Sequence, residues 1–242
     1  MIGDGKLPHY ALENVMGRKM VGSIAWTPQQ RLLAGIGLAL AFGFILLESI
    51  PGLVPRELSA RAWRGIALQW FATLVVALIA FRGLGLGFRD LGMRVPRLMD
   101  WLVMAIVLMI SVVSVGLVAK LFPGAENSRS AVNQLSSLHL PIRILLVGTA
   151  GICEEFLFRG YGIEVLARFT KDRWVAGLLA LFFFGIAHAG IVGWTTQLIF
   201  PFLLGAFLTL LYLLRGNLVI AMVMHSLIDT IGIILVPLLN GR

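Results

Sequence analysis

The sequence is poor in charge, and this lack restricts the class of protein. Only 13% of its 242 residues are charged and 59% are hydrophobic, whereas about a quarter of the residues in a soluble domain carry charge. So few charges cannot cover a surface that faces water. The chain also has a single cysteine, Cys153, which excludes an internal disulfide. We interpret Cys153 as a small buried apolar residue rather than a catalytic thiol.

The scarce charges cluster and leave apolar windows of roughly 20 residues, the length that a helix needs to cross a hydrocarbon core. These windows are continuous and rich in Leu and Ala, which favours helices over the alternating strands of a barrel. The sequence therefore predicts an all-α, polytopic transmembrane bundle that forms a single integral membrane domain over residues 1–242. We predict about seven spans, or eight if one segment is re-entrant or interfacial, at 32–50, 65–81, 101–122, 141–169, 174–190, 194–214 and 217–238.

The net charge of +8 is compatible with nucleic-acid binding, but the basic residues stand in short loops between the windows. Retention of cationic loops on the cytoplasmic side explains them without a partner. We therefore predict no nucleic-acid partner, a bacterial-type inner or plasma membrane, and a cytoplasmic amino terminus. Charges interrupt any signal-peptide core in residues 1–30, which we predict to be cytoplasmic or interfacial. The charged stretch 83–97 is predicted to be a cytoplasmic loop.

Ionisable side chains occur inside several predicted spans, where each costs at least about 2.5 to 3.5 kcal/mol on insertion scales. Such residues therefore require a functional or structural reason. With a helical rise of about 1.5 Å per residue, their distances from the ends of the spans place these side chains near the middle of the membrane. The fourth span contains Glu154 and Glu155, the fifth contains His188, and the seventh contains His225 and Asp229.

The spacing of these residues predicts which of them share a helix face. Glu155 and Arg159 are four residues apart and are predicted to form an ion pair, which turns Glu154 toward another surface. His225 and Asp229 are also four residues apart and share a face. Small residues beside these sites allow helix backbones to approach closely; they include Gly151, Gly160 and Gly185.

Three motifs in order resemble those of the CPBP family of intramembrane proteases, which includes the prenyl-protein (CAAX) endopeptidases and bacteriocin-processing relatives. The resemblance covers about the last hundred residues, so that 141–238 would form the catalytic core helices. The motifs are EExxxR at Glu154, Glu155 and Arg159; FxxxH at Phe184 and His188; and HxxxN/D at His225 and Asp229.

The resemblance implies a glutamate-dependent endopeptidase that cleaves near the carboxyl terminus or the leader of a membrane-anchored peptide or protein substrate in the bilayer. Glu154 would be the general base on a water that His188 helps to orient, and His225 with Asp229 would stabilise the oxyanion. The third motif more usually ends in Asn. Because an ionised Asp cannot donate a hydrogen bond, Asp229 must be protonated or must orient His225. Structural support would come from Glu155, Arg159 and Phe184.

Other readings of the same polar residues stay open. They could bind zinc, but no HExxH signature occurs, so we predict no cofactor and keep a zinc-dependent peptidase as the alternative. They could instead form an interhelical clamp, the proton relay of a transporter or an immunity-type binding protein. The substrate is likewise open between a prenylated carboxyl-terminal peptide, a bacteriocin leader and a sorting tail.

Overall fold

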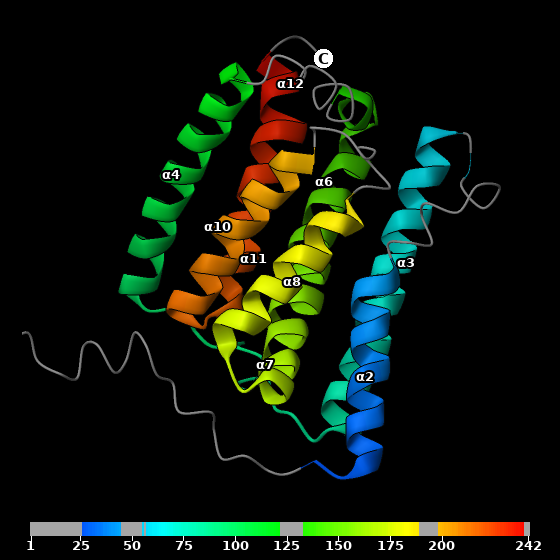
Figure 1. The fold of residues 1–242 in the computed structure, drawn as a ribbon. Helices are drawn as coiled ribbons and strands as arrows, with labels where there is room; N and C mark the ends of the chain where they lie inside the picture. The colour runs from blue at the N-terminus through cyan, green and yellow to red at the C-terminus, as the bar shows by residue number, and fades with distance from the viewer. Residues whose placement is uncertain (1–25, 45–54, 56, 122–132, 189–197, 240–242) are drawn as a thin grey trace, which may run out of the picture.

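The computed structural model describes residues 26–44, 55, 57–121, 133–188 and 198–239. Regular structure within these residues is helical, with no strand among them. The helices lie side by side as a bundle (Figure 1). The predicted all-α fold is therefore confirmed for the described part of the chain.

The helices follow the predicted windows to within a few residues, except that the second begins at Leu58 rather than at residue 65. Parts of four predicted spans, 45–50, 122, 189–190 and 194–197, and residues 1–25 of the predicted amino-terminal segment lie outside the described residues. The elements are α2 (Pro28–Gly43), α3 (Leu58–Leu78), η2 (Ile79–Gly83), α4 (Leu98–Leu121), α6 (Leu140–Thr149), η4 (Ala150–Ile163), α7 (Glu164–Thr170), α8 (Arg173–Ala187), α10 (Ile199–Arg215), α11 (Leu218–Asp229), η6 (Thr230–Leu235) and α12 (Val236–Leu239).

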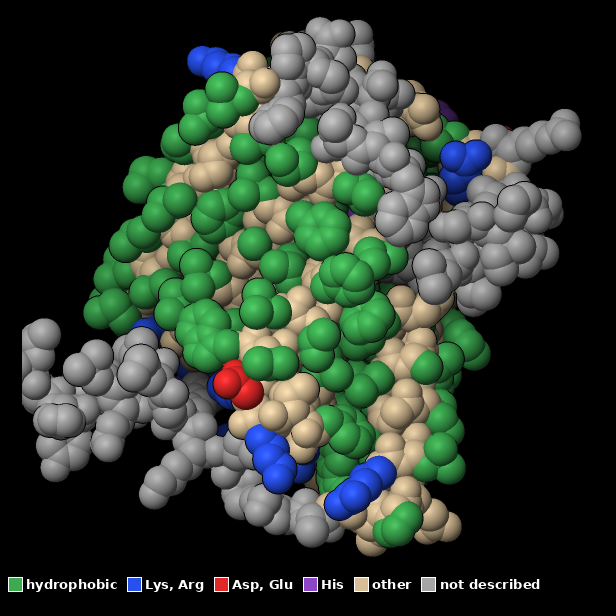
Figure 2. Space-filling model, in the orientation of Figure 1, with side chains coloured by type: hydrophobic (Ala, Val, Ile, Leu, Met, Phe, Trp, Pro, Cys, Tyr) green, Lys and Arg blue, Asp and Glu red, His purple; other side chains and the backbone are tan. Residues whose placement is uncertain are grey.

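The outer surface of the bundle suits lipid rather than water. Three helical stretches in the described residues are long and apolar enough to cross a membrane, namely Leu58–Gly83, Leu98–Leu121 and Leu218–Leu239, and two shorter apolar helices, α8 and α10, accompany them. Hydrophobic side chains cover most of the face in Figure 2. On α4, Met109 and Val113 are more than 60% exposed. The protein is therefore an integral membrane protein.

One end of the bundle, the lower end in Figure 1, collects the connections between α3 and α4, α7 and α8, and α10 and α11. In the predicted loop 83–97, Gly83 is the last residue of η2, and the rest contains no helix and turns at residues 88–92. Next to it, the buried carboxylate of Asp100 accepts hydrogen bonds from Arg215 Nε at 2.8 Å and Asn217 Nδ2 at 3.3 Å. These bonds fasten the start of α4 to the junction of α10 and α11.

The fourth predicted span is one continuous helix from Leu140 to Thr170, but its middle is a π-helix. In η4 the backbone bonds run from residue i to i+5, a rare arrangement that often occurs at functional sites. The sequence did not predict it. Nearly all of the 14 residues of η4 are buried, including Cys153 as predicted. This segment contacts α2, α3, α8 and α11, so the residues it carries lie at the centre of the bundle.

Glycines permit the closest helix contacts around this segment. A Cβ on Gly151 would meet the Ser226 hydroxyl and would come within 3.1 Å of the Met222 carbonyl oxygen, both on α11. A Cβ on Gly185 would meet the ring of Phe202 on α10. The close approach predicted at these two glycines is confirmed.

Candidate active site

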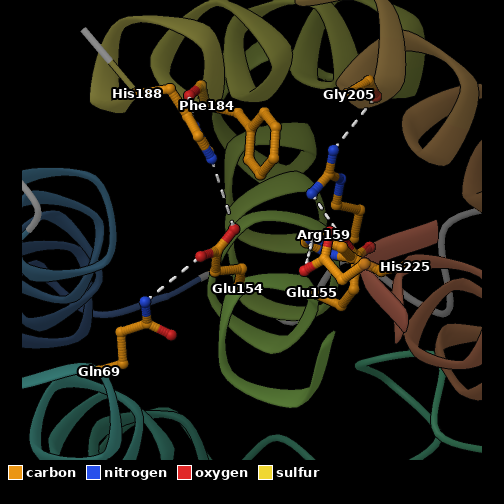
Figure 3. Close-up of polar contacts among 9 residues, drawn as sticks. Gln69, Glu154, Glu155, Arg159, Phe184, His188, Gly205 and His225 are labelled. Atoms are coloured by element: carbon orange, nitrogen blue, oxygen red, sulfur yellow. Dashed lines mark hydrogen bonds and ion pairs between the residues drawn. The ribbon is translucent and has the colours of Figure 1, made fainter. Parts of the chain in front are cut away.

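The two adjacent glutamates of η4 face different partners, as predicted (Figure 3). Glu154 points toward Gln69 of α3 and toward His188 at the end of α8. Glu155 points toward Arg159 and His225. The site is therefore built from two halves, one around each carboxylate.

In the first half, Oε2 of Glu154 lies 3.9 Å from Nε2 of His188. The other ring nitrogen of His188, Nδ1, lies 2.8 Å from the Phe184 carbonyl oxygen. Because a carbonyl only accepts, Nδ1 must donate this bond, and when the ring is neutral it presents the Nε2 lone pair toward Glu154. A separation of 3.9 Å is too long for a direct hydrogen bond, and Oε2 is buried without a hydrogen-bond partner. The two acceptor atoms are near enough to contact the same water molecule.

The start and the length of α8 place His188 at the same height in the bundle as Glu154. The preceding helix, α7, ends at Thr170, and its C-cap residue Lys171 has a left-handed φ of 60°. Asp172 then caps α8 by accepting bonds from the Trp174 and Val175 backbone amides. The 15 residues of α8 extend about 22 Å from this end of the bundle. His188 follows directly as the C-cap residue, which places its ring beside the middle of η4.

In the second half, the predicted ion pair between Glu155 and Arg159 is confirmed, with 2.7 Å between Oε1 and Nη1. Neither side chain is more than 1% exposed. Arg159 also donates to the Gly205 carbonyl oxygen at 3.1 Å, and its guanidinium carbon lies 4.2 Å from the centre of the Phe184 ring. The guanidinium is thus held by three groups and compensates the buried charge of Glu155.

His225 joins this second half through a bond that the sequence did not predict. Its Nδ1 lies 2.8 Å from Glu155 Oε1, and its Nε2 lies 3.7 Å from Asp229 Oδ2. Spacing along the chain predicted only the pairing with Asp229, because Glu155 is 70 residues away on another helix. When Nδ1 donates to the carboxylate, Nε2 can donate to a further group only if both ring nitrogens carry protons.

The Phe184 ring connects the two halves. Its centroid lies 4.5 Å from that of His188 and 6.3 Å from that of His225. The side chain is 3% exposed and forms an apolar wall against which both imidazoles rest. A supporting role for Phe184 stays a prediction, and its contacts agree with that role.

Sequence reasoning missed Gln69. Its Nε2 donates to Oε1 of Glu154 at 3.3 Å, across 85 residues of chain. The available signal was a lone amide side chain within an apolar helix, where polar groups find partners on neighbouring helices.

No group of three or more His, Cys, Asp or Glu side chains that could hold a metal ion occurs in the part of the chain that the structure describes. The expected absence of a cofactor and the alternative of a zinc-dependent enzyme both remain predictions, to be tested by metal analysis.

Comparison with known proteins bears on residues 136–231, which match the model of a family described as type II CAAX prenyl endopeptidase Rce1-like. The matched range contains all three motifs. No curated protein and no solved structure matches the chain. Over residues 136–231 the chain is therefore similar to the Rce1-like CAAX prenyl endopeptidase family, in agreement with the resemblance that the three motifs carry.

Proposed function

We propose that this protein is an intramembrane endopeptidase in which Glu154 acts as general base on a water molecule. The observation that carries the proposal is the position of Glu154 Oε2, which is buried, has no hydrogen-bond partner and faces Nε2 of His188 at 3.9 Å. A carboxylate with free accepting capacity beside a second acceptor can bind both hydrogens of one water. The lone pairs of that water are then directed away from the protein, toward a substrate carbonyl.

In the proposed reaction, the water oxygen bonds to the carbonyl carbon of the scissile peptide while Glu154 takes one of its protons. The π electrons of the carbonyl move onto its oxygen and give a tetrahedral oxyanion. Collapse of this intermediate breaks the C–N bond, and Glu154 returns the proton to the leaving amine nitrogen. His188 keeps the water oriented throughout, because its Nδ1 is anchored to the Phe184 carbonyl.

His225 and Asp229 are the proposed stabilisers of the oxyanion. Nε2 of His225 can donate to it when the ring is an imidazolium, whose charge Glu155 and Asp229 would compensate from either side. Asp229 can donate itself only when protonated, and otherwise it orients His225. A donor placed where charge develops is commonly worth about 10²- to 10³-fold in rate.

The proposed substrate is a membrane-anchored peptide or protein cleaved near its carboxyl terminus, a class supported by the CAAX prenyl endopeptidase description of the matching family. A leader peptide of bacteriocin type is the alternative within this proposal. We further propose that the enzyme needs no metal and resides in a bacterial-type inner or plasma membrane.

The proposed topology has seven spans, with the amino terminus in the cytoplasm and the carboxyl terminus outside. It is supported by basic residues in or beside the connections that Figure 1 shows at the lower end of the bundle. From the bounds of the helices, these residues include Arg82, Arg97, Lys171, Arg173 and Arg215. Reporter fusions at residues 90, 171 and 216 should all be cytoplasmic. A fusion at residue 90 on the opposite side from one at residue 216 would exclude this topology.

The direct test uses purified protein in liposomes and an internally quenched peptide that ends in a farnesylated cysteine followed by three residues. Wild-type protein should release the terminal residues, and Glu154→Gln should not. The matched control is Glu57→Gln, which changes an exposed glutamate at the start of α3 and should cleave like the wild type. Cleavage by Glu154→Gln at the wild-type rate would refute the proposal.

A further inference from the structure

Helix α3 is fastened to the fourth span by two neighbouring residues. Nε2 of Gln69 donates to Glu154 Oε1 at 3.3 Å, and Nε1 of Trp70 donates to Thr149 Oγ1 at 3.1 Å. Thr149 precedes η4 and Glu154 lies five residues later, the spacing that one i→i+5 hydrogen bond of a π-helix spans. Helix α3 therefore meets the fourth span beside the proposed catalytic carboxylate.

The hydrogen bond from Gln69 makes the two oxygens of Glu154 unequal. The amide nitrogen of Gln69 can only donate, so Oε1 of Glu154 is the acceptor of this bond. Oε2 is left without a partner and faces His188. Rotation of the carboxylate, which would exchange the two oxygens, would break the bond to Gln69.

The surroundings of Gln69 also distinguish it from a packing residue. Its own Oε1 and the hydroxyl of Thr73, four residues later on the same face of α3, are buried without hydrogen-bond partners. Buried polar atoms of this kind are usually paired, often by ordered water. Polar groups thus line the face of α3 that meets Glu154.

We propose that Gln69 is a positioning residue of the peptidase: its side-chain amide fixes the Glu154 carboxylate so that Oε2, beside His188, receives the proton of the attacking water. Gln69 lies outside residues 136–231, which match the family model, so the match does not assign it this role. The inference rests on the proposed function, because it concerns the orientation of the proposed base.

The kinetic test compares two variants of adjacent residues. Gln69→Met keeps the length of the side chain and removes the amide, so kcat should fall by about 10- to 100-fold while KM stays within about twofold, since loss of orientation affects the chemical step. Trp70→Phe removes the other bond between the same helices and keeps an aromatic ring, so its kcat should stay within about threefold. An unchanged kcat in Gln69→Met, or an equal loss in both variants, would overturn the inference.

An infrared measurement tests the same inference without cleavage. The carboxyl band of Glu154 is identified by its loss in Glu154→Gln, and it should shift in Gln69→Met while remaining in place in Trp70→Phe. A band that keeps its frequency in Gln69→Met overturns the positioning role. If instead the band shifts but wild-type protein cleaves no peptide, the proposed function fails while the contact between Gln69 and Glu154 stands.

Discussion

Glu154 and Glu155 are neighbours in the chain and are both buried in η4, yet their surroundings differ in kind. Glu155 Oε1 receives bonds from Arg159 and His225, each within 2.8 Å. Glu154 receives one longer bond from the neutral amide of Gln69, and its second oxygen faces His188 without a hydrogen bond. A buried carboxylate with a guanidinium partner is suited to holding structure. Oε2 of Glu155 also has no hydrogen-bond partner, but Glu154 has no guanidinium partner and its open oxygen faces His188, which suits it to proton transfer. Partners rather than residue type therefore separate the two proposed roles.

The largest effect is expected from Glu154→Gln, which keeps the shape of the side chain and removes the base. The cleavage rate should fall by about 10³-fold or more, since general-base catalysis typically contributes about 10²- to 10⁴-fold, while the unfolding midpoint in detergent stays close to that of the wild type. The rate is measured with the quenched farnesyl peptide. A large loss of stability would instead indicate that Glu154, like its neighbour, mainly holds the helices together.

The opposite pattern is expected from Arg159→Met, which leaves Glu155 buried without its guanidinium. Breaking a buried pair in this way typically costs about 3–5 kcal/mol, so the unfolding midpoint should drop together with the yield of folded protein. The control is Arg31→Met, at an exposed position of α2. Wild-type stability in Arg159→Met would show that the ion pair does not support the fold.

A smaller loss of rate is expected from His188→Ala, because Glu154 would keep its basic oxygen while the water loses one of its two contacts. We expect kcat to fall by about 10²-fold, with stability retained. His139, the exposed residue before α6, makes no side-chain capping bond, and His139→Ala is therefore the matched control. Equal activity in both variants would remove His188 from the reaction.

No effect is expected from a chelator if Glu154 acts without a metal. Purified protein should contain no stoichiometric zinc, and treatment with a chelator followed by its removal should leave the rate of peptide cleavage unchanged. Loss of activity that zinc restores would favour the zinc-dependent alternative and would assign the open oxygen of Glu154 to a metal ion.

Much of the fold could be predicted because its physical causes are local. Apolar windows fixed where the helices lie, and the four-residue spacing of Glu155 and Arg159 correctly predicted their ion pair. Contacts between helices could not be predicted in the same way. The bonds of His225 with Glu155 and of Gln69 with Glu154 span 70 and 85 residues and depend on how helices pack.

The π-helical form of η4 could not be predicted from the sequence pattern either. A segment buried on nearly all sides has no solvent-exposed polar face whose period could distinguish i→i+5 from i→i+4 bonding. The roles of Glu154, His188, His225 and Asp229 remain predictions, which the structure supports with geometry and which only chemistry can test.

The central claim is that Glu154 delivers a water molecule to a peptide carbonyl. Single-turnover cleavage of the farnesyl peptide in H₂¹⁸O, followed by mass spectrometry of the new carboxyl terminus, tests it most directly when wild-type protein and Glu154→Gln are compared. We predict one ¹⁸O atom in the wild-type product and no product from Glu154→Gln over the same time. Labelled product formed by Glu154→Gln as fast as by the wild type would contradict the account.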